Sequence, residues 1–225
     1  MELKADYDIR QMLVVHGRAT SSNVQTVMWL IGELGVPFER IDVGGPFGGN
    51  TDPSFLAMNP MGRVPVVQDD QVTLFESQAI LRYLAARHRA YTLWPQDPAE
   101  RAAVDQWLEW SKINVAPVLI YKVFWQLIRT SAVDRDTDRL AEGVAELKPL
   151  MSIADQQIAK YGWLAGHNFS LADISFGTQL FRYYTVPFDK EELPNLTRYY
   201  QRLTTRPAYT EHVMVSFEPL RVPGA

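Results

Sequence analysis

The most informative absence is that of cysteine, which does not occur among the 225 residues of the sequence. This absence excludes disulfide bonds, zinc sites built on cysteine and a nucleophilic thiol belonging to the protein. Any thiol chemistry must therefore use a thiol carried by a ligand. The four histidines are scattered along the sequence without a His-x-x-x-His pair, so no metal site is predicted.

Long apolar runs and clusters of basic residues are missing too. No apolar run approaches the roughly 18 residues of a membrane-spanning helix, and residues 1–6 lack the basic start and apolar middle of a signal peptide. The net charge is −4, from 22 basic and 26 acidic side chains, which gives no basic footprint for nucleic acid. These absences predict a cytoplasmic protein that binds neither membranes nor nucleic acid.

The N-terminal part of the sequence alternates between strand and helix patterns. An apolar strand at residues 12–15 precedes a helix with one apolar stripe, which Gly35 should end. Residues 40–43 alternate like a second strand, and Asp52-Pro53 is typical of the start of a short helix. Two antiparallel strands and a further helix complete the order β-α-β-α-β-β-α. Because a helix crossover joins parallel strands, we expect a mixed four-stranded sheet.

The C-terminal part shows only helical periodicity. Residues 99–128 read as one long helix, in which Pro117 should cause a kink or a local loss of hydrogen bonds. Ser170 and Asp173 stand at the spacing of a capping box. Further helices are predicted at residues 136–161, 194–204 and 208–213. We therefore expect an α/β domain over residues 10–88, followed by an all-helical domain over residues 97–217.

Two short motifs flank the predicted strand pair: the segment from Asn59 to Pro65 precedes it, and Glu76-Ser77 follows it. Proline cannot donate a ladder hydrogen bond, so Pro65 should mark a strand start, with a cis Val64–Pro65 bond as an option. Ser77 is placed to cap the next helix, and a helix N-terminus favours anions. An exposed strand edge beside an anion site suits a small peptide with carboxylates.

This arrangement resembles the glutathione site of the cytosolic glutathione transferases, which is built on a thioredoxin-like domain. Both parts of that family's signature, Asn-Pro-x-Gly-x-Val-Pro and Glu-Ser, stand in this sequence. The resemblance covers nearly the whole chain and is greatest to serine-type enzymes of the bacterial, phi or theta kind. It implies glutathione as co-substrate, a thioredoxin-like domain followed by a helical domain, a homodimer and a role in detoxification.

The start of the first helix carries the catalytic candidates Ser21, Ser22 and Asn23. The residue types alone favour simple capping of the helix. In serine-type transferases a serine of this loop donates its hydroxyl to the glutathione sulfur, so the resemblance implies that role for Ser21. Ser22 is the rival, and Asn23 is a second polar candidate. A free thiol has a pKa of about 8.5, which a hydroxyl donor and a helix N-terminus would lower.

The resemblance also implies how glutathione is held. The N–H and C=O of Val64, beside Pro65, would pair with the cysteinyl backbone, while Ser77 would take the γ-glutamyl carboxylate and Glu76 its ammonium group. Arg63 is placed to attract the glycyl carboxylate, but the sequence does not decide which residue binds that group. Without the resemblance, Glu76 and Arg63 would be interpreted as surface charges and Ser77 as a helix cap.

An aromatic stretch on the predicted long helix comprises Tyr121, Phe124 and Trp125. Such spacing is typical of a helical core, but the same helix lines the substrate cleft in the transferase family. We therefore predict attack by the glutathione thiolate on a small hydrophobic electrophile. The alternatives are glutathione-dependent reduction of disulfides or peroxides and a non-catalytic binding protein of the same fold.

Overall fold

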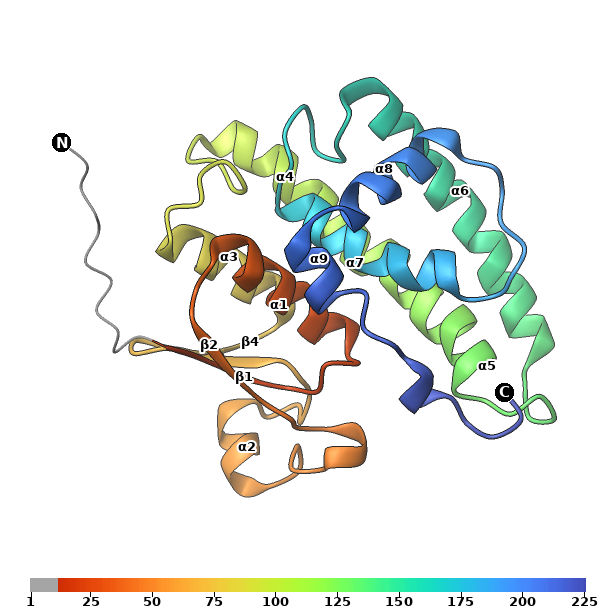
Figure 1. The fold of residues 1–225 in the computed structure, drawn as a ribbon, viewed down its shortest axis with the longest axis horizontal. Coiled ribbons are helices and arrows are strands. Elements are labelled where there is room, and N and C mark those ends of the chain that lie inside the picture. Colours follow the sequence, from red (N-terminus) through yellow and green to blue (C-terminus); the bar gives the residue numbers. More distant parts are fainter. Residues whose placement is uncertain (1–11) are drawn as a thin grey trace.

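The protein folds into a sheet domain packed beside a larger helical domain (Figure 1). The computed structural model describes residues 12–225, so the predicted domain start at residue 10 lies outside the described residues. No helix within residues 12–225 is both long and apolar enough to cross a membrane.

The sheet contains four strands in the order β2-β1-β3-β4. β1 (Leu13–His16) is parallel to β2 (Phe38–Ile41) and antiparallel to β3 (Val66–Gln68), which pairs antiparallel with β4 (Thr73–Phe75). The predicted mixed sheet and element order are therefore confirmed. β2 begins two residues before its predicted start, because its register with β1 pairs Leu13 with Phe38 and His16 with Ile41.

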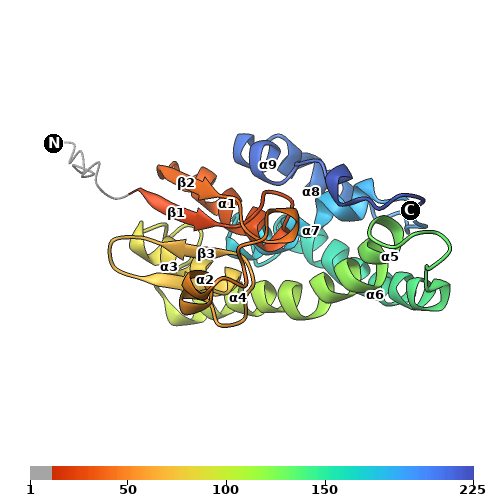
Figure 2. The same ribbon diagram turned by 90° about the horizontal axis from the view of Figure 1, so that it is seen from below.

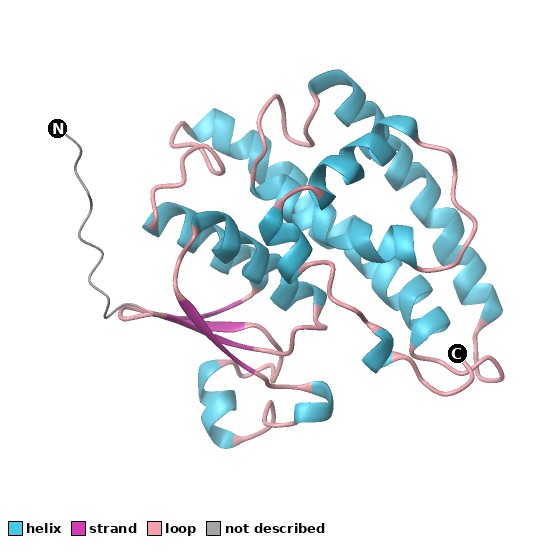
Figure 3. Cartoon of the chain, in the orientation of Figure 1, coloured by secondary structure: helices cyan, strands magenta, loops and turns pink. Residues whose placement is uncertain are grey.

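Helices cover the two faces of the sheet unequally (Figures 1 and 3). α1 (Ser22–Leu34) and α3 (Ser77–Arg87) pack together over one face, and the short α2 (Pro53–Met58) lies on the other. The predicted apolar stripe of α1 is buried in the core except for its last residue, Leu34, which is partly buried, and Gly35 ends the helix with a φ of 63°. A single 3-10 turn, Gly45–Phe47, interrupts the glycine-rich loop between β2 and α2.

The predicted long helix is continuous through its proline. It comprises α4 (Pro98–Trp110), π-helical segments at Ser111–Val115 and Val118–Phe124, and α5 (Trp125–Ile128). Pro117 itself keeps helical angles of −64° and −40°. Because proline lacks an N–H, the helix widens into π turns around Pro117, which is the predicted local loss of α-helical hydrogen bonds.

The remaining helices surround a central one (Figure 2). α7 (Leu171–Thr185) is buried on nearly all sides and contacts α1, α4 and α8. The helices that complete the domain are α6 (Thr137–Tyr161), α8 (Pro194–Thr204), α9 (Pro207–His212) and a 3-10 turn at Glu218–Leu220. Trp29 of α1 is fully buried and places its ring 4.6 Å from that of Tyr209, which joins the two domains through one core.

The capping box at the start of α7 belongs to a larger buried network. Asp173 is fully buried and accepts hydrogen bonds from the Ser170 N–H at 2.8 Å and the Ser170 hydroxyl at 3.1 Å. It also accepts from the Leu164 N–H at 2.9 Å and the Tyr199 hydroxyl at 2.8 Å. The predicted box is thus confirmed, and it holds the preceding loop and α8 as well.

We expect Asp173→Ala to lower the free energy of unfolding by about 3 kcal/mol or more, because an unsatisfied buried donor costs about 1–3 kcal/mol. The matched control is Asp136→Ala, which removes an exposed N-cap that accepts from Arg139 N–H and should cost about 0.5–2 kcal/mol. Denaturant unfolding measures both variants. Equal losses in the two proteins would contradict the buried-network interpretation.

Candidate functional site

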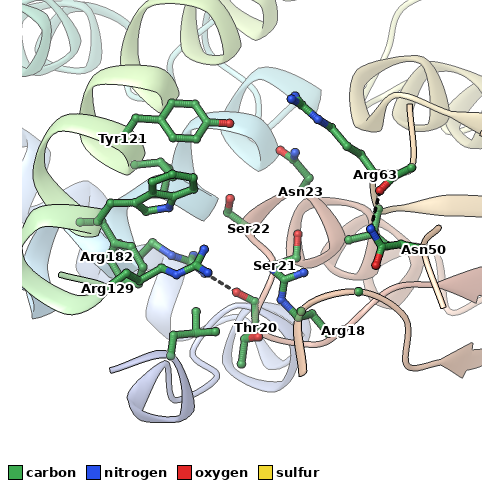
Figure 4. A pocket seen from close by; sticks show the side chains of 18 of the residues that line it. Arg18, Thr20, Ser21, Ser22, Asn23, Asn50, Arg63, Tyr121, Arg129 and Arg182 are labelled. Atoms are coloured by element: carbon green, nitrogen blue, oxygen red, sulfur yellow. Dashed lines mark hydrogen bonds between the residues drawn. The ribbon is translucent and has the colours of Figure 1, made fainter. Parts of the chain in front are cut away.

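A cavity of about 470 Å³ lies where the sheet domain meets the long helix (Figure 4). It is lined by the start of α1, the loops before α2 and β3, and side chains from α6, α7 and the C-terminal tail. Of the candidate residues from the sequence, it brings together Ser21, Ser22, Asn23, Arg63, Val64, Tyr121, Phe124 and Trp125. Pro65, Glu76 and Ser77 do not line it directly.

Ser21 occupies the N-cap position of α1, with backbone angles of −82° and 124°. Its C=O accepts from the Gln25 N–H at 2.8 Å, as a cap residue should, but its hydroxyl makes no capping hydrogen bond. The side-chain capping that the residue type alone favours is therefore absent. The Ser21 hydroxyl is left available to a group in the cavity, beside the positive end of the helix.

Asn23 is held by a lysine that the sequence analysis missed. The Lys112 ammonium group donates to Asn23 Oδ1 at 2.7 Å and lies 3.4 Å from Ser77 Oγ. Burial lowers the pKa of Lys112, although the nearby Glu76 and Glu109 act in the opposite direction. Lys112 thus connects the helical domain to the first turns of α1 and α3. Nothing local in the sequence indicates contacts that span 89 and 35 residues.

The start of α3 differs from its prediction by one residue. Glu76, and not Ser77, occupies the N-cap position, and Ser77 is the first residue of the helix. Glu76 is exposed and has a φ of 69°, a conformation that costs about 1–3 kcal/mol for a residue other than glycine. The Ser77 side chain is buried and faces Lys112. Strained backbone of this kind is concentrated at binding sites.

The segment before β3 presents an open backbone edge. The Val64–Pro65 peptide bond is cis, and Val64 lines the cavity. Within residues 12–225, the N–H and C=O of Val64 take part in no hydrogen bond. Asn59 fixes the neighbouring loop by donating to the Arg63 C=O at 2.7 Å. This geometry suits backbone pairing with an extended peptide.

Arginines dominate the electrostatics of the cavity. Five of them line it, and no aspartate or glutamate of the described chain does. Arg182 of α7 is almost completely buried, and its guanidinium donates to Gln25 Oε1 at 2.7 Å and the Thr20 C=O at 3.0 Å. Burial is the main cause that lowers the pKa of Arg182 to about 10; Tyr209 acts in the opposite direction, and the charge of Arg18 adds to the lowering.

Arg18 lies in the loop just before Ser21. Burial and, second, the charge of Arg129 lower the pKa of Arg18. Its Nε is buried without a hydrogen-bond partner among the described residues. The sequence does not indicate this cluster, because Arg129 and Arg182 lie more than 100 residues from Arg18 along the chain. Within residues 12–225, no group of three or more histidine, aspartate and glutamate side chains is arranged to hold a metal ion.

The aromatic residues of the long helix divide between the core and the cavity. Phe124 is buried against Phe217, with ring centroids 5.2 Å apart, and also reaches the cavity wall. Tyr121 and Trp125 are exposed at the cavity and meet edge to face at 4.9 Å. Phe124 is thus part of the core, as the spacing indicates, and all three residues line the cavity.

The sequence matches known protein families in both domains. Residues 11–86 match the family described as "Glutathione S-transferase, N-terminal domain". Residues 112–207 match "Glutathione S-transferase, C-terminal domain".

Similar proteins span nearly the whole chain. Glutathione S-transferase GstB of Escherichia coli (strain K12) is 36% identical over 206 residues, 91% of this chain and 99% of that protein. Glutathione S-transferase 4 of Zea mays is 31% identical over 198 residues, 86% of this chain and 88% of that protein. The theta class glutathione S-transferase of Xanthomonas axonopodis pv. citri, solved with glutathione bound, is 40% identical with a TM-score of 0.87, covering 92% of this chain and 99% of that one.

Proposed function

Because the chain belongs to the glutathione S-transferase family and is a glutathione-dependent transferase, we propose that Ser21 stabilises the thiolate of bound glutathione. The observation that carries this assignment is the Ser21 hydroxyl, which lines the cavity at the N-cap of α1 without capping the helix. Ser22 and Asn23 line the same cavity, but Asn23 Oδ1 is already bound by Lys112.

The required stabilisation of the thiolate is modest. Lowering the pKa of the glutathione thiol by about 2 units, from about 8.5, needs about 2.7 kcal/mol. A hydrogen bond to a charged group contributes about 1.5–3 kcal/mol, and a helix N-terminus about 0.3–1 kcal/mol. Ser21 and the first turn of α1 can therefore supply the effect together, and the nearby charge of Arg18 acts in the same direction.

The rest of glutathione would extend from the sulfur along the edge before β3. The backbone groups of Val64 would pair with the cysteinyl residue, beside the cis bond to Pro65. Ser77, with Lys112 next to it, would take the γ-glutamyl carboxylate, and the exposed Glu76 would take the ammonium group. Arg63 would attract the glycyl carboxylate.

The reaction is nucleophilic attack by the glutathione thiolate on an electrophile. Sulfur forms a bond to the electrophilic carbon, while the leaving group departs with the bonding electrons or the electrons move onto an activated double bond. We propose that Tyr121, Phe124 and Trp125 form the wall against which the electrophile packs, so that it is held close to the sulfur. No observation favours the disulfide or peroxide reduction that the sequence left open.

We expect Ser21→Ala to raise the pKa of the enzyme-bound glutathione thiol by about one to two pH units, because it removes a hydrogen bond to the thiolate. Ser22→Ala, one residue further along the same helix, is the matched control and should leave the titration unchanged. The ultraviolet absorbance of the thiolate, followed against pH, measures both. The reverse result would move the assignment from Ser21 to Ser22.

We expect Ser77→Ala and Lys112→Met each to raise the KM for glutathione by about tenfold or more, with kcat changed by less than about twofold, because they remove contacts distant from the sulfur. Lys122→Met is the control, since Lys122 lies on the same long helix and pairs with Glu142 and Glu146. Steady-state kinetics with varied glutathione measures all three. An unchanged KM in both test variants would rule out the carboxylate site.

We also propose that the protein acts in the cytoplasm, in detoxification, as a homodimer. Exposed apolar side chains such as Phe47, Met61 and Ile113 are the kind of surface that a subunit interface covers. Light scattering at micromolar concentration should give twice the 25.7 kDa mass of the chain. A mass equal to that of one chain would contradict the dimer.

A further inference from the structure

Four arginines from four separate elements line the cavity together with Tyr121 and Trp125. Arg18 comes from the loop after β1, Arg129 from the end of α5, Arg139 from α6 and Arg182 from α7. Among the residues that the structure describes, no carboxylate forms an ion pair with any of the four. Their positive charge is therefore not neutralised within the described chain.

This concentration of like charge is unfavourable in the protein alone. Burial lowers the pKa of Arg18 and of Arg182. Repulsion by Arg129 adds to this lowering at Arg18, and repulsion by Arg18 adds to it at Arg182. Buried charges in proteins are normally paired, yet Arg182 has only neutral acceptors from Gln25 and Thr20. A bound anion would offset the repulsion between these arginines, so the cavity should bind an anionic group more tightly than a neutral one.

Glutathione, bound as proposed above, places its thiolate near Arg18 but leaves the charges of Arg129, Arg139 and Arg182 without an anionic partner. Its two carboxylates lie with Arg63 and with Ser77, and only its thiolate reaches Ser21. Figure 4 shows Arg129 and Arg182 together with Tyr121 on one side of Ser21 and Ser22, while Arg63 and Asn50 lie on the other. Arg129 and Arg182 therefore face the space left for the second substrate.

We propose that the electrophile carries an anionic group, a carboxylate or sulfonate, attached to an aromatic or alkyl body. This inference rests on the proposed function and narrows its substrate class. Arginine binds such groups through paired N–H donors, while Tyr121 and Trp125 contact the apolar body. The anion would lie among Arg18, Arg129 and Arg139, and the reacting carbon would lie near Ser21.

The test compares two aryl chlorides, 4-chloro-3,5-dinitrobenzoate and 4-chloro-3,5-dinitrobenzamide, which have similar shapes and differ by one negative charge. In both, the thiolate sulfur bonds to the carbon that bears chlorine, and chloride leaves with the bonding electron pair. Each kcat/KM is divided by the rate constant of the same reaction without enzyme. We expect this ratio to favour the benzoate by at least about tenfold, the effect of one charge-assisted hydrogen bond.

The variants Arg129→Gln and Arg139→Gln, alone and combined, test which residues cause that preference. Both positions are exposed, so neither change should prevent folding. The control is Arg101→Gln, because Arg101 stacks on Trp94 at 4.0 Å much as Arg129 stacks on Trp125 at 5.0 Å, yet lies outside the cavity lining. The combined variant should lose most of the benzoate preference, and the control should keep it.

Binding of the two glutathione conjugates is measured in parallel by calorimetry, so that the inference does not depend on turnover. The carboxylate conjugate should bind at least about tenfold more tightly than the carboxamide conjugate. Equal rates and equal affinities for the two members of the pair would overturn the inference while conjugation itself persists. Failure to conjugate either chloride would instead count against the proposed function, and the affinities would still decide the preference for an anion.

Discussion

The position of the α1 N-terminus depends on one buried guanidinium group. Arg182 of α7 donates to the Thr20 C=O and to Gln25 Oε1, and Gln25 donates in turn to the Ala19 C=O at 2.9 Å. These bonds fix the loop that carries Ser21, although the loop belongs to the sheet domain and Arg182 to the helical one. The geometry around the sulfur is therefore a property of both domains together.

Two further contacts cross the same boundary and show why the site needs the helical domain. Lys112 links the first turn of α1 to the first turn of α3. The cysteinyl sulfur of glutathione would lie at the first of these turns and its γ-glutamyl group at the second. Trp29 packs against Tyr209 and joins the two domains through one hydrophobic core. A thioredoxin-like sheet alone would provide the backbone edge at Val64 together with Arg18 and Arg63, but neither Lys112 nor the three further arginines of the cavity, Arg129, Arg139 and Arg182.

Local patterns in the sequence predicted most of the fold. The apolar stripe of α1, the Gly35 stop, the mixed sheet and the Ser170–Asp173 box follow from short-range rules, and the structure has them. The errors were also local: β2 is displaced because its register with β1 decides its ends, and Glu76 replaces Ser77 as N-cap through a strained backbone. Lys112 and the arginine cluster escaped prediction because only tertiary folding brings these distant positions together.

The central claim is that glutathione binds with its sulfur at the Ser21 hydroxyl and its backbone along Val64, leaving the arginine-lined side for the second substrate. A crystal structure of the protein with glutathione tests this most directly. We expect a sulfur atom within about 3.5 Å of Ser21 Oγ and backbone hydrogen bonds to Val64. A sulfur atom held by Ser22, or glutathione carboxylates occupying the cluster at Arg129 and Arg182, would contradict it.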